Sequence, residues 1–405
     1  MLKRVYVFIH LSRSWVPCGL LEYFEEGRFS SSIFRYGKKY LQRSDAISID
    51  PMQLPLQDVT FSTPDGFSIF NGIRDAGPDA WGRYLLDKKF SRALNEIEYI
   101  AAASYDRVGA LGFSDSLAHP PGTFQEDEKF HISKKTFRLN LDQSLGAVDD
   151  AIKAEETERL FEYLSYGPSL GGARPKASVI LSEKLYLAKF TLERDKKDES
   201  LIEYATMTLA KKCGLRVPEL RLEKIGKRSI YLIERFDRVG DKRLPFISGL
   251  TATGIHESDY TSWSYFSLVD AIIKYSINPE KDLKELFRRL VFNIAVYNND
   301  DHLRNFGFLG GEKNSWNLSP LYDVVPTAIN TETYSLAMTL GRDGKLASYR
   351  NALSMCERFR LTKTDATQII DEVREIVSGW REHFHSLGAT EKDIGIIQNS
   401  FKEKA

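Results

Sequence analysis

The sequence predicts an α+β fold with a β-rich N-terminal part and a helical C-terminal part. Three observations predict it: aromatic-rich strand-like segments up to about residue 120, a glycine-rich stretch followed by hairpins at 168–237, and helical periodicity beyond about residue 260. The chain has 405 residues, which is long for one hydrophobic core, and 42% of them are hydrophobic. Roughly two or three folded domains are therefore expected.

The N-terminal part alternates strand candidates with turns. "RVYVFIHL" and "RFSSSIFRY" have the aromatic and β-branched composition of strands. A short helix is expected over 79–87, directly after the turn at Gly77-Pro78. The polar stretch 117–130 then marks a domain boundary.

Two hairpins with a helix between them are expected in the middle of the chain. The apolar runs at 179–181 and 185–190 flank a turn at 182–184, and a second hairpin turns at Gly226-Lys227. The helix between them carries apolar residues every four positions, at Leu201, Ala205 and Leu209. Gly214 and Pro218 follow it, as is typical of a helix end.

The C-terminal part shows the periodicity of amphipathic helices. One apolar face runs into Asn298 and consists of Leu283, Leu286, Phe287, Leu290 and Ile294. A second consists of Ile369, Ile370, Val373, Ile376, Val377 and Trp380, with Thr362 as its expected N-cap.

The charge balance and the cysteines narrow the functional classes. Lys plus Arg (56) equals Asp plus Glu (56), so no global basic field exists to hold nucleic acid. Cys18, Cys213 and Cys356 are far apart without a CxxC pair, which favours a reducing compartment over disulfides or a zinc ribbon. The apolar run at the N-terminus is too short for a signal peptide, and no window is long enough to span a membrane. A cytoplasmic protein is expected.

The stretch "SLGGARPKA" precedes the first predicted hairpin. Gly171 and Gly172 would let backbone N–H groups turn toward a phosphate, and Lys176 would add a positive charge beside it. Most Gly-Gly pairs are simply turns, so this stretch alone leaves both interpretations open.

Lys189 lies within the apolar strand candidate "YLAKF". Burial of its ammonium would cost several kcal/mol unless an anion lies beside it, and Glu203 on the next helix is a candidate partner. The alternatives are an edge strand with Lys189 in water and a solvated helix face for Glu203. At the end of the second hairpin, "YLIERFDR" places Glu234 and Phe236 where they would meet a purine ring, although this stretch by itself is better explained as an ordinary strand end.

The stretch "AVYNNDDHLRNFGFL" is the strongest chemical signal. Asp300 and Asn305 are five residues apart, the spacing of a catalytic loop that holds both a base and a metal ligand. Asp323, in "LYDVVP", would supply a second oxygen ligand for magnesium near nucleotide phosphates. Capping residues at a helix end, or a metallohydrolase site using Asp300, Asp301 and His302, remain alternatives, but no second histidine-rich segment completes the latter.

Taken together, these motifs resemble the HipA family of bacterial toxin kinases. The resemblance covers nearly the whole chain and rests on four segments in the family's order, "SLGGARPKA", "ERFDR", "NNDDHLRNF" and "LSPLYDVVP". It implies a protein-kinase-like, two-lobed fold with an all-helical C-terminal lobe. The implied divisions are an N-terminal β-rich subdomain at 1–125, a kinase N-lobe with glycine-rich loop and hinge at 126–238, and a helical C-lobe at 239–405.

The resemblance also implies roles in the catalytic loop. The family pattern N-x-D-x-H-x-x-N falls on Asn298, Asp300, His302 and Asn305, which makes Asp300 the expected catalytic base. That register leaves the neighbouring Asp301 as the variable position. Asn305 and Asp323 would then bind magnesium.

The nucleotide-binding residues follow in the same way. The resemblance assigns the nucleotide lysine to Lys189, which Glu203 would pair with and orient toward the phosphates, and the adenine-side hinge to Glu234 and Phe236. It assigns the phosphate-binding loop to Ser169, Gly171, Gly172, Ala173 and Lys176. Ser169 would also be autophosphorylated. Arg174 replaces a glutamine found in some members, which affects loop closure rather than phosphate binding.

The resemblance implies an ATP- and magnesium-dependent serine/threonine kinase, the toxin of a toxin–antitoxin module. Its substrate would be a translation component such as an aminoacyl-tRNA synthetase. A small helix-turn-helix antitoxin would be its partner, and DNA would be bound only indirectly through that partner. The alternatives are a small-molecule kinase of similar fold and a catalytically silent nucleotide-binding regulator.

Overall fold

The computed structural model describes residues 3–103, 106–119, 121–122, 139–140, 176–191, 195–225, 228–311, 314–328 and 333–402. The chain forms two compact units, each built from several segments. Unit 1 comprises Met1–Leu187, Arg235–His256 and Phe308–Trp316. Unit 2 comprises Ala188–Glu234, Glu257–Gly307 and Asn317–Ala405.

A five-stranded antiparallel sheet forms the N-terminal region of unit 1. Its strand order is β4-β3-β2-β1-β5. The strands are β1 Arg4–Leu11, β2 Ser14–Glu26, β3 Phe29–Tyr36, β4 Thr60–Ser62 and β5 Leu111–Ser114. Alternate residues of β1, such as Val5 and Val7, are fully buried. Hydrophobic burial on one face therefore sets the register of these strands.

Short helices lie between successive strands of this sheet in the chain, and one more comes after it. They are α1 Lys38–Leu41, α2 Asn71–Arg74, α3 Ala80–Phe90, α4 Glu96–Ala102 and, later in the sequence, α8 Gly249–Thr253. Helix α3 confirms the helix expected after Gly77-Pro78, and Asp79 caps it by accepting a hydrogen bond from the Gly82 N–H.

The second five-stranded sheet contains the strands of both predicted hairpins, and the expected turn at Gly226-Lys227 lies outside the described residues. Its order is β6-β7-β8-β10-β9, with β6 Leu139–Asn140, β7 Lys176–Leu181, β8 Lys184–Phe190, β9 Leu220–Ile225 and β10 Arg228–Glu234. Ser182 and Glu183 form the turn between β7 and β8 and both have positive φ, as a tight two-residue hairpin requires. Two smaller sheets pair β11 Arg238–Val239 with β12 Lys242–Arg243, and β13 Phe246–Ser248 with β14 Gly307–Gly310 and β15 Trp316–Leu318.

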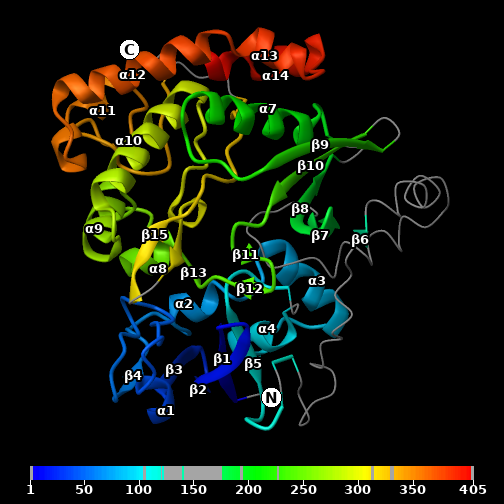
Figure 1. Cartoon of the computed structure of the whole chain (residues 1–405), viewed down its shortest axis with the longest axis vertical. Coiled ribbons are helices and arrows are strands. Elements are labelled where there is room, and N and C mark those ends of the chain that lie inside the picture. Colours follow the sequence, from blue (N-terminus) through cyan, green and yellow to red (C-terminus); the bar gives the residue numbers. More distant parts are fainter. Residues whose placement is uncertain are drawn as a thin grey trace. The chain divides into compact units, whose positions relative to one another are not determined.

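Helices make up most of unit 2. They are α7 Glu199–Lys212, α9 Tyr265–Tyr275, α10 Pro279–Val296, α11 Tyr349–Leu353, α12 Lys363–Ser378, α13 Trp380–Ser386 and α14 Glu391–Ile397, with 3₁₀ turns η2 Leu303–Asn305, η4 Cys356–Phe359 and η5 Gln398–Phe401. Figure 1 shows α7 lying across β9 and β10, and α12 beside α10.

Helix α10 is the central helix of unit 2. Its predicted apolar face is buried, with Leu283, Phe287 and Ile294 fully inaccessible to solvent. Pro279 begins it at a position where no backbone N–H is required. Helix α12 begins at the predicted cap, since the Thr362 hydroxyl accepts from the Asp365 N–H in a capping box.

The expected α+β class, with a β-rich N-terminal part and a more helical C-terminal part, is confirmed. The C-terminal part is not purely helical, because β11 to β15 are strands after residue 237. The three-part division at 125 and 238 stays a prediction. Cys18, Cys213 and Cys356 are buried and unbonded to one another. No helix within the described ranges is long and apolar enough to cross a bilayer.

Candidate functional site

Lys189 lies between two carboxylates in unit 2. Its Nζ donates to Glu203 Oε1 at 2.6 Å and to Asp323 Oδ1 at 2.7 Å. The side chains of Lys189, Glu203 and Asp323 are 17%, 8% and 26% exposed. These three residues, here called the Lys189 cluster, decide between the two interpretations of the strand: the lysine is enclosed with anions rather than directed into water.

The two carboxylates control the charge of this lysine. Burial by itself would lower the pKa of the Lys189 ammonium, but the adjacent charges of Asp323 and Glu203 outweigh burial and raise the pKa above its usual value. Lys189 is therefore a permanent cation at any physiological pH. Such a fixed charge suits the binding of phosphate groups.

Hydrogen bonds at the end of β8 fix the distance between Lys189 and helix α7. The Ser200 hydroxyl donates to the Lys189 carbonyl oxygen at 3.0 Å, and the Thr191 hydroxyl donates to Asp198, the N-cap of α7, at 2.7 Å. Because strand and helix are joined at this point, Glu203, one turn into the helix, is held beside the lysine.

Tyr231, on β10, lies near the two carboxylates of the Lys189 cluster. It is fully buried, and its hydroxyl has no hydrogen-bond partner among the described residues. Burial and then the nearby charges of Glu203 and Asp323 raise the pKa of this phenol well above its usual value. Tyr231 is a residue of the site that the sequence did not indicate, because its position reads as an ordinary apolar strand residue.

Asp323 has a strained backbone. Its φ is 60°, in the left-handed region that residues other than glycine rarely adopt, with aspartate and asparagine found there more often than most. The neighbouring chain holds this conformation: the Leu321 N–H donates to Arg216 O, and the Tyr322 hydroxyl donates to the carbonyl oxygen of Arg304. Strain of this kind is concentrated at functional sites.

The predicted catalytic loop emerges from the end of α10. The helix closes at Tyr297, whose φ of 49° turns the chain sharply, and the Tyr297 carbonyl oxygen accepts from the Thr327 N–H. Asp300, three residues later, has 74% of its side chain exposed, and its Oδ1 lies 3.6 Å from His302 Nε2. A carboxylate in this position is accessible to a substrate hydroxyl.

The electrostatic surroundings of Asp300 connect it to the Lys189 cluster. Although most of the side chain is exposed, partial desolvation raises the pKa of Asp300; His302 opposes this shift, and the carboxylate of Asp323 adds to it. The two aspartates thus lie close enough to sense each other's charge. A raised pKa makes Asp300 a stronger base.

Asn305 closes the loop. Its Nδ2 donates to the Asp300 carbonyl oxygen at 2.6 Å, and the side chain is nearly buried. With the amide oriented in this way, Oδ1 is left as an oxygen donor. The loop therefore brings Asp300 and Asn305 together, as their spacing predicts.

Asp301, by contrast, is an internal anchor. Its Oδ2 accepts from the Tyr265 hydroxyl at 2.6 Å and its Oδ1 from the Ala337 N–H at 2.6 Å. Burial raises the pKa of Asp301 to about 7. Asn293 donates to the same tyrosine oxygen, and Asn298 donates to Asn293. This buried chain holds the loop against the protein interior.

Sequence reasoning missed three members of that anchor: Tyr265, Asn293 and the role of Asp301. The density of amides and carboxylates around 298–305 was a signal, since two adjacent aspartates in an extended loop point to opposite sides. Nothing in the sequence indicated Tyr265, which lies 36 residues before Asp301.

In the predicted hinge, Glu234 and Phe236 are interspersed with three charged residues that form a buried cluster. Arg235 Nε and Nη2 donate to the two Asp237 oxygens at 3.0 and 2.7 Å, and Arg238 Nη1 donates to Asp237 at 2.7 Å. We call Arg235, Asp237 and Arg238 the Arg235 cluster. The Glu234 N–H donates to Glu219 O, and the Phe236 ring lies 6.3 Å from that of Phe246.

The Arg235 cluster binds the segment that precedes β5. Arg235 and Arg238 donate to the carbonyl oxygens of Asp106 and Arg107, and the Gly109 N–H donates to Asp237 at 2.7 Å. The "ERFDR" motif thus has a structural role in unit 1. The adenine-side role of Glu234 and Phe236 stays a prediction.

Lys176 forms an ion pair within unit 1. It is buried, and its Nζ lies 2.9 Å from Asp79 Oδ2. Its contact with a nucleotide phosphate stays a prediction, as does that of Ser169, Gly171, Gly172 and Ala173. These four residues and Arg174 lie outside the described residues.

Comparisons with known proteins identify the family. The family described as HipA-like C-terminal domain matches residues 168–380, more than half of the chain. A Haemophilus influenzae protein named for an inferred kinase activity is 26% identical over 206 residues, covering 44% of this chain and 60% of its own length. A Sinorhizobium fredii protein named in the same way is 27% identical over 206 residues, covering 47% and 48%. The match thus spans about half the length of these curated relatives.

A solved structure shares the fold. HipA of Shewanella oneidensis MR-1, determined with HipB and operator DNA, matches with a TM-score of 0.67 and 15% identity, over 98% of this chain and 95% of that one. At this identity the likeness concerns the fold, which is the kinase-like architecture expected from the sequence.

Proposed function

The chain belongs to the family with a HipA-like C-terminal domain, and from that premise we propose that it is an ATP- and magnesium-dependent protein serine/threonine kinase. The observation that carries the proposal is the Lys189–Glu203 ion pair of 2.6 Å between a strand and a helix. In protein kinases a lysine–glutamate pair between a strand and a helix positions the lysine for the nucleotide phosphates. Asp300 and Asn305 complete the set on a loop of the same unit.

Each residue has a distinct task in this proposal. Lys189 binds the phosphates as a permanent cation, and Glu203 fixes its direction. Asp300 orients the substrate hydroxyl and accepts its proton, while His302, 3.6 Å away, limits the orientations of the carboxylate. The anchor through Asp301 keeps the loop rigid, because positioning provides much of the rate enhancement in phosphoryl transfer.

The donor set fits magnesium. Magnesium in such sites is held by one or two protein oxygens together with waters and substrate phosphates, and it neutralises charge on the phosphates when bound. Asp323 and the Oδ1 of Asn305 would hold it. No group of three or more His, Cys, Asp or Glu side chains among the described residues could form a closed metal site, which agrees with an ion bound mainly through nucleotide.

Isotope-labelled ATP tests the kinase activity. The purified chain is incubated with ATP, magnesium and a bacterial lysate, and phosphosites are mapped by mass spectrometry. We expect new phosphoserine or phosphothreonine with wild type and with Asp371→Ala, an exposed aspartate on α12, and none with Asp300→Ala. Equal labelling by Asp300→Ala would contradict the assignment, whereas labelling of small metabolites alone would favour a small-molecule kinase.

The magnesium assignment has its own test. Asp323→Asn replaces a charged ligand by a neutral one and should remove most of the magnesium dependence of ATP binding in calorimetric titrations. If magnesium strengthens ATP binding in the variant as much as in wild type, Asp323 is not a ligand.

The proposal extends to a toxin–antitoxin module. The fold shared with a HipA that was solved with HipB and operator DNA supports a small helix-turn-helix antitoxin as partner. The equal numbers of acidic and basic residues support DNA binding through that partner. The expected substrate is a translation component such as an aminoacyl-tRNA synthetase. Expression of wild type, but not of Asp300→Ala, should arrest growth, and co-expressed antitoxin should relieve the arrest.

Autophosphorylation of Ser169 is the regulatory part of the proposal. A phosphate there would add nearly two negative charges beside the glycine-rich stretch, where nucleotide phosphates are expected, and would disfavour ATP. Phosphosite mapping after incubation with ATP, followed by ATP titration of the phosphorylated form, tests this. Unchanged ATP affinity of the phosphorylated protein would contradict it.

A further inference from the structure

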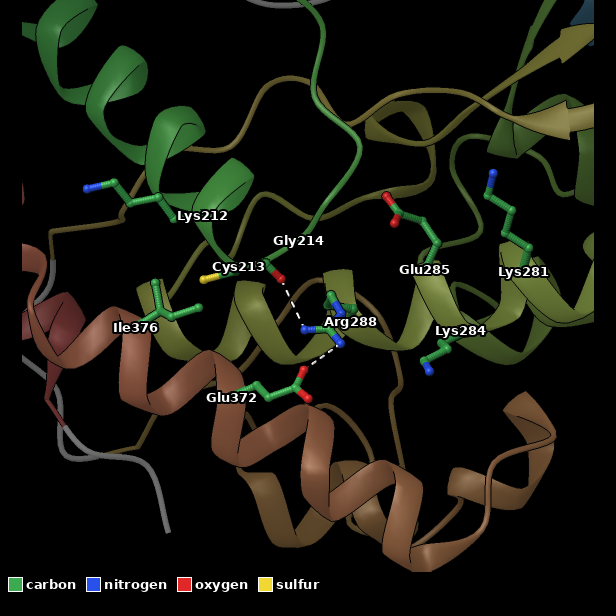
Figure 2. A pocket seen from close by; sticks show the side chains of 9 residues that line it. All are labelled: Lys212, Cys213, Gly214, Lys281, Lys284, Glu285, Arg288, Glu372 and Ile376. Atoms are coloured by element: carbon green, nitrogen blue, oxygen red, sulfur yellow. Dashed lines mark hydrogen bonds and ion pairs between the residues drawn. The ribbon is translucent and has the colours of Figure 1, made fainter.

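A cavity of about 470 Å³ lies in unit 2, away from every residue assigned above. The end of α7, one face of α10 and the middle of α12 form its walls, and Figure 2 shows their side chains. Its volume is within the range of small-ligand sites. Cys213 and Ile376 give it an apolar side, and the remaining lining is dominated by charged residues.

The α10 wall carries a row of cations. Lys281, Lys284 and Arg288 line the cavity at intervals of three and four residues, so they lie on the same face of the helix. Like charges at this spacing destabilise a helix, and cations near a helix N-terminus also oppose the helix dipole. These three cations therefore do not stabilise one another, and Lys281 gains nothing from the helix dipole.

The acidic residues of α10 form ion pairs with arginines and not with Lys281 or Lys284. Glu280 pairs with Arg360, Asp282 with Arg216 and Glu285 with Arg289. In the part of the chain that the structure describes, no carboxylate forms an ion pair within 4 Å with Lys281 or Lys284. Lys284 is near enough to Asp365 and Glu372 of α12 to lower the pKa of both carboxyl groups, whereas Lys281 has no such effect on either.

The other two cations that line the cavity, Arg288 and Lys212, already have hydrogen-bond partners. Arg288 donates to the Cys213 carbonyl oxygen at 3.1 Å and to Glu372 at 2.7 Å, the two dashed lines in Figure 2. Lys212 points away from Arg288 in the same view, and its Nζ lies 2.9 Å from His383 Nδ1. Arg288 therefore supports the wall, and the positive charge available to a ligand comes from Lys281 and Lys284.

We propose that this cavity binds a small phosphate-bearing polyanion of up to nucleotide size, held by Lys281 and Lys284 beside Arg288. A multiply charged anion would neutralise the cation row that α10 cannot neutralise by itself. The concave shape and the apolar side favour a compact ligand over an extended one. The inference does not depend on the proposed kinase activity, because none of its residues belongs to the Lys189 cluster or to the catalytic loop.

Calorimetric titration of the full chain with inorganic pyrophosphate at physiological salt tests the proposal. The matched variants are Lys281→Gln/Lys284→Gln and Lys38→Gln/Lys39→Gln, the latter removing two exposed lysines of α1. Loss of two charge-assisted contacts should weaken binding by about tenfold or more in the first pair and leave it unchanged in the second. Equal affinity of the two variants, whether retained or lost in both, would overturn the proposal.

Hydrogen exchange locates the binding site. Pyrophosphate should slow amide exchange in 279–288 and 372–376 of wild type but not of the Lys281→Gln/Lys284→Gln variant. Protection confined to the surroundings of Lys189 would assign the binding to the nucleotide site and overturn the proposal. So would lysine-dependent binding of a short DNA duplex without any binding of pyrophosphate, because the occupant would then be a nucleic-acid backbone.

Discussion

The Lys189 cluster and the Arg235 cluster both enclose ionised side chains, but their surroundings differ. In the Arg235 cluster, Arg235 and Asp237 are only 2% and 3% exposed, and backbone groups of 106–109 satisfy the remaining donors and acceptors. In the Lys189 cluster, Asp323 remains 26% exposed on a left-handed backbone. A sealed and fully bonded cluster specifies structure, whereas a partly open, strained one is able to exchange partners with a ligand.

The same distinction separates the adjacent residues Asp300 and Asp301. Asp300 is open to solvent, and Asp301 is buried against Tyr265 and Ala337. Substitutions at open positions should therefore change catalysis, and substitutions at sealed positions should change stability. Variants at open and at sealed positions test that division.

Asp300→Ala should have the largest effect on activity. Loss of the base should lower kcat by about 10²–10⁴-fold, while the urea midpoint stays close to that of wild type because the side chain is mostly exposed. Steady-state phosphorylation kinetics and urea denaturation measure the two quantities. A large drop in the midpoint would show that Asp300 is structural and would remove the contrast with Asp301.

Asp237→Asn should have the largest effect on stability. It leaves Arg235 and Arg238 buried with like charges and without their anion, which should lower the free energy of unfolding by about 3–5 kcal/mol. Asp241→Asn, at an exposed position in the β11–β12 turn, is the control. At a concentration and temperature where the variant stays folded, nucleotide affinity should be nearly normal; a selective loss of ATP binding would instead indicate direct hinge function.

Lys189→Ala should affect both quantities moderately. Removal of its charge-assisted contacts should weaken ATP binding by about 10–100-fold. The loss of stability should be smaller than for Asp237→Asn, because Asp323 is partly hydrated. Lys184→Ala on the same strand is the control. ATP titration measures the loss of affinity, and denaturation measures whether the loss of stability is smaller than for Asp237→Asn. If Lys189 served mainly to hold the fold, Lys189→Ala would lose more stability than Asp237→Asn.

Asp301 should produce a smaller, pH-dependent effect. Its pKa of about 7 in the folded protein exceeds that of an unfolded aspartate, about 3.9. Its contribution to stability is therefore complete in acid below about pH 4 and is lost as the pH rises through about 7. The difference in unfolding free energy between wild type and Asp301→Asn should fall across this window, by about 1–4 kcal/mol. A difference independent of pH would show that Asp301 is ionised throughout.

Local sequence predicted many of the helices and hairpins, while the catalytic role of the loop at 298–305 stays a prediction. The hairpin turn near Ser182, the end of α7 at Gly214 and the Thr362 cap depend on residues a few positions apart, so short-range hydrogen bonding and backbone preference determine them. The pairing of Asn305 with Asp300 spans only five residues and belongs to the same class.

Contacts between residues far apart in the sequence could not be predicted from local sequence. Lys189 and Asp323 are 134 residues apart in the sequence, and the site exists only because the fold brings them within 2.7 Å. The assignment of Lys189 to a buried cluster rather than to an edge strand needed the sheet order, in which β8 is an internal strand. Lys176 shows the same limit, since its partner Asp79 lies in a distant helix cap.

The sequence by itself determined the α+β class, the positions of the helices and hairpins, and the spacing of the polar residues in the proposed catalytic loop at 298–305. These follow from periodicity, turn chemistry and capping, which act over a few residues. Only the tertiary structure decided which aspartate of the Asp300-Asp301 pair is open, which lysine is enclosed by carboxylates, and that the "ERFDR" arginines bind Asp237 and backbone carbonyl groups. Burial decides these outcomes, because the pKa and the partners of an ionised group depend on distant segments that exclude water around it.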